Sequence, residues 1–66
     1  MKLPKNHKIW VTMMLPDETN FVITSPIVDR SVYYLFKFNN ENDYTQLGTS
    51  NNPIKLENNV FSGKYS

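Results

Sequence analysis

The hydrophobic pattern of this chain alternates with a period of two, and the alternation is clearest from Ser31 to Phe38. The even positions of this segment are Val32, Tyr34, Phe36 and Phe38, and its odd positions are Ser31, Tyr33, Leu35 and Lys37. Successive side chains of a strand point to opposite faces, so the even set predicts one continuous apolar, buried face. β-branched and aromatic residues fit a pleated sheet better than a helix. We therefore expect a central strand here, flanked by other strands.

Shorter runs with strand character lie on both sides of this segment. They are Lys8–Leu15, Phe21–Thr24, Tyr44–Leu47, Ile54–Glu57 and Val60–Phe61. In the first run one predicted face carries Ile9, Val11, Met13 and Leu15, and the other carries Lys8, Trp10, Thr12 and Met14. Turn-forming residues separate the runs, including 16–20, the loop 48–53 and a two-residue turn at Asn58–Asn59. The first two runs should pair as an antiparallel hairpin.

This order predicts an all-β fold, a small antiparallel meander of five to six short strands curled into a barrel or compact sandwich. An α+β alternative begins a short helix near Pro26. There Ser25 would be the N-cap and the proline would take the first helical position. The apolar stripe of that helix would be irregular, so the strand interpretation is favoured.

The length of 66 residues predicts a single small β domain over residues 1–66, in which residues 1–7 form a flexible arm. The chain has no cysteine, so neither a disulfide nor a thiolate zinc site is expected. No apolar run predicts a signal peptide or a membrane span, so we expect a cytoplasmic protein. Nine asparagines and no alanine indicate an AT-rich genome, such as that of a low-GC bacterium, its phage or an organelle. If a phage or mobile element encodes the chain, the expected location is the host cytoplasm.

The candidate catalytic residues form no recognisable set. His7 is the only histidine, and no cysteine or second imidazole accompanies it as a metal ligand. The acidic residues fall in predicted turns, where solvation explains them, and the segment 48–53 lacks the lysine of a phosphate-binding loop. We therefore expect no enzyme, no metal and no cofactor.

Aromatic and basic residues on the predicted outer faces suggest a binding surface instead. The candidate protein interface consists of Trp10, Met14, Arg30, Tyr33, Lys37 and Lys8. Trp, Tyr, Met and Arg are enriched where proteins bind proteins. The alternative is that a second layer of the same domain covers these side chains.

The sequence thus predicts a non-enzymatic protein-binding module, of the kind a phage uses to modulate a host protein. Its partner would be a larger protein or a second copy of the chain. One alternative function is a small structural subunit of a larger assembly such as a virion. Another is a barrel that binds single-stranded nucleic acid, which the net charge of +1 disfavours.

Overall fold

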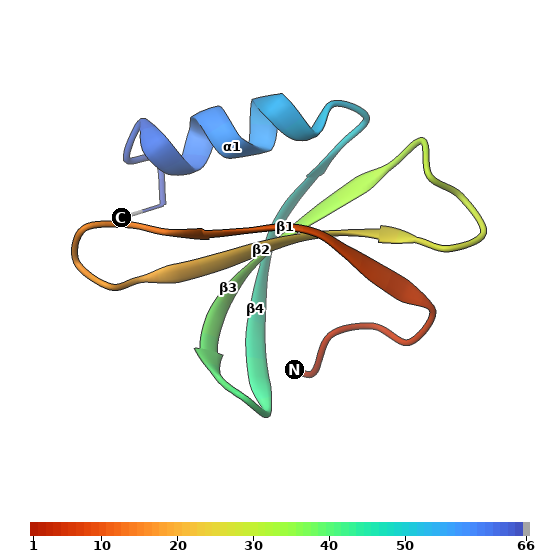
Figure 1. The fold of residues 1–66 in the computed structure, drawn as a ribbon, viewed down its shortest axis with the longest axis horizontal. Coiled ribbons are helices and arrows are strands. Elements are labelled where there is room, and N and C mark those ends of the chain that lie inside the picture. The colour runs from red at the N-terminus through yellow and green to blue at the C-terminus, as the bar shows by residue number, and fades with distance from the viewer. Residues whose placement is uncertain (66) are drawn as a thin grey trace.

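The computed structural model describes residues 1–65 as one antiparallel sheet followed by a helix (Figure 1). The elements are β1 (His7–Met14), β2 (Asn20–Pro26), β3 (Tyr33–Asn40), β4 (Asp43–Ser50) and α1 (Pro53–Phe61). The strands lie side by side in the order β1-β2-β3-β4. The predicted meander is therefore confirmed, including the hairpin of the first two strands and the central position of β3.

The sheet does not close into a barrel, and no second sheet packs against it within residues 1–65. β1 and β4 form its two edges, and each pairs with one neighbour only. The predicted barrel or sandwich is wrong because four strands and a helix replace the five to six expected strands. The fold is mostly β with one short helix in the described chain.

The C-terminal segment is the main correction to the sequence interpretation. Residues 54–57 and 60–61 were expected to be strands joined by a turn at Asn58–Asn59, and all of them lie in α1. The helix begins because the Asn52 side chain accepts a hydrogen bond from the Ile54 amide and Pro53 occupies the first turn. It ends where Gly63 takes a φ of 85°, a conformation that glycine adopts without steric cost.

The helix that the alternative interpretation placed near Pro26 does not form there. β2 continues through Pro26, and a turn comes next at Ile27–Val28. A capping residue followed by proline does begin a helix in this chain, but it does so at Asn52–Pro53 and not at Ser25–Pro26. The residues after the cap make the difference, since Leu56 and Val60 provide an apolar pair four residues apart that the sheet can bury.

The core lies between α1 and one face of the sheet. Its buried members are Met13, Phe21, Ile23, Leu35, Leu56 and Val60. Register places the odd residues of β3 on this face, because Leu35 pairs with Ile23 and Tyr33 packs against the same cluster. The helix therefore covers the face that the sequence had marked as mixed.

The even face of β3 is also largely covered, as predicted for Phe36, which is fully buried.

The first six residues connect the two edges of the sheet, on the side away from α1 in Figure 1. The Tyr44 amide donates to the Met1 carbonyl at β4, and the Ile27 amide donates to the Asn6 carbonyl beside the start of β1. His7 belongs to β1, where its Nδ1 lies 3.0 Å from the Thr24 hydroxyl.

Candidate functional site

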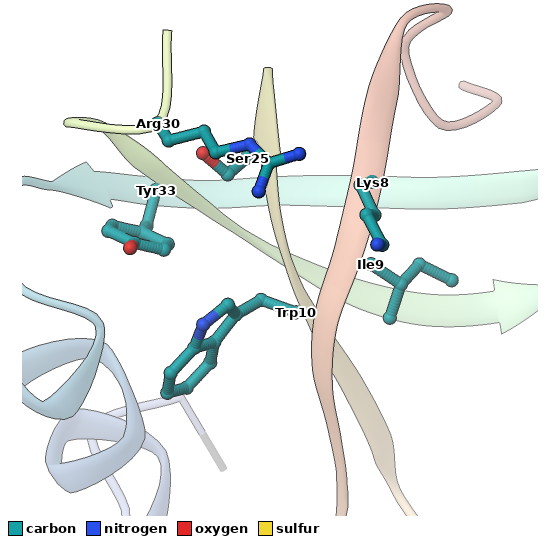
Figure 2. A pocket seen from close by; sticks show the side chains of 6 residues that line it. All are labelled: Lys8, Ile9, Trp10, Ser25, Arg30 and Tyr33. Carbon is teal, nitrogen blue, oxygen red and sulfur yellow. The ribbon is translucent and has the colours of Figure 1, made fainter. Parts of the chain in front are cut away.

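A surface hollow of about 280 Å³ lies where β1 passes the loop between β2 and β3 (Figure 2). We call it the aromatic hollow, and its lining consists of Lys8, Ile9, Trp10, Ser25, Arg30 and Tyr33. Four of the six residues that the sequence singled out as an interface therefore meet here. This hollow is the candidate site.

Trp10 and Tyr33 form the aromatic part of the hollow. Their ring centroids are 5.8 Å apart with an interplanar angle of 72°, the edge-to-face arrangement that aromatic pairs favour. Tyr33 is half-buried and packs against the core, whereas the Trp10 residue is 50% exposed. One ring is thus held by the fold, and the other is half open to a partner.

A β-bulge places Trp10 in this position. The register between β1 and β2 shifts between Ile9 and Val11, so one residue of β1 has no direct partner. A bulge reverses the alternation of faces, and the expected grouping of Ile9 with Val11 and Met13 is therefore wrong. Val11 and Met13 pack in or against the core, but Ile9 is 48% exposed and lines the hollow.

The loop that carries Arg30 is held by Ser25, a buried residue of β2. Its hydroxyl lies 2.9 Å from the Val32 carbonyl oxygen and 3.4 Å from that of Asp29, with both carbonyls as acceptors. The backbone on both sides of Arg30 is thus attached to the sheet. Ser25 positions the cation without contributing a charge.

Asp29 adds a second local constraint to the same loop. Its carboxylate accepts hydrogen bonds from the Ser31 hydroxyl and the Ser31 amide, which is the geometry of an Asx turn. These two bonds favour the ionised form, so they lower the pKa of Asp29 below the ordinary carboxyl value. The carboxylate is therefore used within its own loop and forms no ion pair with Arg30.

The two cations of the hollow have no acidic partner. Lys8 and Arg30 are exposed, and among residues 1–65 the only ion pair joins the Met1 amine to Asp43. None of the lining residues is acidic. The hollow is consequently an aromatic site with two available positive charges.

The remaining two predicted interface residues lie elsewhere. Met14 is exposed at the far end of β1, opposite Asn20. Lys37 pairs in register with Phe21 and Thr45 and does not line the hollow. Conversely, sequence reasoning missed Ile9, which the bulge exposes, and Ser25, which was considered only as a possible helix cap.

Other features of the described residues give no competing site. A smaller hollow of about 240 Å³, lined by Thr12, Asn20, Phe21, Val22 and Phe38, contains no charged group. Within residues 1–65, no three histidine or acidic side chains lie close enough together to hold a metal ion. No helix in that range is long and apolar enough to cross a membrane.

Comparison with protein-family models, with curated proteins and with solved structures finds no match to this chain. The function is therefore inferred from the geometry of the site.

Proposed function

We propose that this chain is a non-enzymatic protein-binding module that contacts its partner through the aromatic hollow and the adjoining strand β1. The observation that carries the proposal is Trp10, a half-exposed indole held against Tyr33 in a hollow that two available cations also line. Trp, Tyr and Arg are the residue types that supply most binding energy at protein interfaces.

Two features favour a protein over other ligands. The hollow is shallow and at the lower limit of about 300 Å³ for small-molecule pockets, so most of a drug-sized ligand would stay in water. The chain has a net charge of only +1, and binding driven by phosphate neutralisation needs several cations together. A protein partner instead uses the indole, the two charges and the edge of the sheet together.

Affinity capture with three forms of the chain tests this proposal. Trp10→Ala removes the central contact, and Phe61→Ala is the matched control because Phe61 is a similarly exposed aromatic residue on α1. Wild type and Phe61→Ala should retain the same protein from a lysate of the source organism, and Trp10→Ala should lose it. Identical retention by all three forms would contradict the proposal.

A further inference from the structure

We infer that the partner presents an acidic extended segment, which adds to the free edge of β1 and places a carboxylate between Lys8 and Arg30. This inference rests on the proposed function, because it specifies the chemistry of the protein that occupies the aromatic hollow. Three observations support it: the charge of the hollow, the open edge of the sheet and the spacing of the residues along β1.

The charge of the hollow selects an anion. Lys8 comes from β1 and Arg30 from the β2–β3 loop, so the two cations approach the hollow from different elements (Figure 2). Neither has an acidic partner within residues 1–65. A carboxylate can accept hydrogen bonds from both, and the planar guanidinium of Arg30 can bind it with two parallel bonds.

The open edge selects an extended peptide. β1 pairs with β2 alone, so the peptide groups along its other side face no strand. The other edge is less open, because the Met1 carbonyl accepts the Tyr44 amide of β4 and α1 packs next to that strand. An exposed strand edge is a template for one more strand, and its main-chain hydrogen bonds have no counterpart in a nucleic acid.

The spacing predicts the pattern of the segment. Lys8 and Trp10 are two positions apart in β1 and both line the hollow. Side chains two positions apart on an added strand also share a face, at about 7 Å. A carboxylate near Lys8 therefore places an apolar side chain of the same segment near Trp10, which gives the order acidic residue, any residue, apolar residue.

Two synthetic probes test this directly. The first is a blocked heptapeptide in which glutamate, phenylalanine and aspartate stand two positions apart, with threonine at the positions between and around them, and the second replaces both acids by their amides. Trp10 is the only tryptophan of the chain, so its fluorescence reports occupancy of the hollow. We expect the acidic peptide to shift the Trp10 emission to shorter wavelength and to bind about tenfold more tightly than the amide peptide.

Charge reversal identifies the cations responsible. Lys8→Glu combined with Arg30→Glu should remove the preference for the acidic peptide. Lys2→Glu combined with Lys55→Glu is the control, because it changes the net charge equally at exposed residues that do not line the hollow. Circular dichroism of each variant establishes that it is folded, and the control pair should retain roughly half or more of the wild-type affinity, as expected for screened surface charges.

The outcomes separate this inference from the proposed function. Equal affinity for the two peptides, or binding of neither, overturns the inference that the partner's segment is acidic. In that case, loss of capture by Trp10→Ala would still support the proposed function, a protein partner. Displacement of the acidic peptide by single-stranded oligothymidylate at physiological salt overturns it in favour of a nucleic acid. Equal capture by wild type and Trp10→Ala overturns the proposed function itself.

Discussion

At the scale of single residues, short hydrogen-bonded contacts determine where the charges of the aromatic hollow lie. Arg30 has no ion pair to hold it, and its position depends on neighbours that attach its backbone. The Ser25 hydroxyl bonds the carbonyls of Asp29 and Val32, and Asp29 bonds Ser31. Arg30 is therefore presented by a loop that is fixed before any partner arrives, which lowers the entropic cost of binding.

Ser25→Ala tests this attachment. Removing the hydroxyl deletes its bonds to the loop, and the expected cost is about 1 kcal/mol of unfolding free energy, the usual value for a neutral hydrogen bond. Urea unfolding followed by far-ultraviolet circular dichroism measures it. An unchanged midpoint would show that the loop is held by other contacts.

Asp29 gives a pH prediction of defined sign. The hydrogen bonds from Ser31 lower the pKa of Asp29 below its ordinary value of 3.8, so its contribution to stability is complete above that value. The contribution is lost as the pH falls through the lowered pKa of the folded state. Binding at Arg30 should consequently be independent of this group at neutral pH.

Carboxyl titration by nuclear magnetic resonance provides the measurement. Ser31→Ala removes the hydroxyl donor and should raise the midpoint of Asp29 toward the ordinary value. Asp17 is the internal control, because its pKa is lowered in the same way by Thr19, which the substitution does not touch. Equal movement of both midpoints, or none, would contradict the assigned cause.

At the scale of elements, α1 completes the core that the sheet alone leaves open. Its buried contacts come from Leu56 and Val60, while Ile54 and Phe61 face outward. A strand would have placed Ile54 and Leu56 on the same face, as the alternation of the sequence suggests. The unfolding free energies lost on truncating Ile54 and Leu56 therefore distinguish a helix from a strand.

Leu56→Ala and Ile54→Ala form this matched pair. Leu56 is 2% exposed, and truncating it should cost about 2 to 5 kcal/mol, whereas Ile54 is 57% exposed and should cost less than about 1 kcal/mol. A chain of this size is expected to have only about 3 to 10 kcal/mol in total, so Leu56→Ala should lose a large share of its unfolding free energy. Similar losses for the two variants in urea unfolding would contradict the helical packing.

The sequence predicted the four strands better than the C-terminal segment, and the reasons are physical. The period of two located the four strands of the meander, and the even face of β3 that it marked for burial contains the fully buried Phe36. The segment 54–57 alternates by coincidence, and the cap at Asn52 with the i, i+4 pair of Leu56 and Val60 determines the helix. Which face α1 would cover was not readable, because β3 is apolar on both faces.

The candidate site was predicted in part, since four of the six proposed interface residues line the hollow. Residue type and the predicted outer faces marked Trp10, Tyr33, Lys8 and Arg30, and the fold brings these four together. It could not separate them from Met14 and Lys37, because that separation depends on a bulge and on positions along the strands. Ile9 was expected to face inward since a bulge leaves no clear mark in the pattern of alternation.

At the scale of the whole molecule, the two edges of the sheet differ, and this asymmetry directs binding to one side. β4 lies next to α1 and its Tyr44 amide donates a hydrogen bond to Met1, whereas β1 has only β2 beside it. Three of the exposed apolar residues, Ile9, Trp10 and Met14, belong to β1, and none of the large exposed apolar residues belongs to β4. The open edge, the half-exposed indole and the unpaired cations thus lie together on one side of the protein.

The most direct test of the central claim is a chemical-shift map of the ¹⁵N-labelled protein titrated with the acidic heptapeptide. We expect the perturbed signals to cluster at the Trp10 indole, the amides of β1 and the loop that carries Arg30, with α1 unaffected. Perturbations centred on the exposed face of α1 at Ile54 and Phe61, or a spectrum that does not change at millimolar peptide, would contradict it.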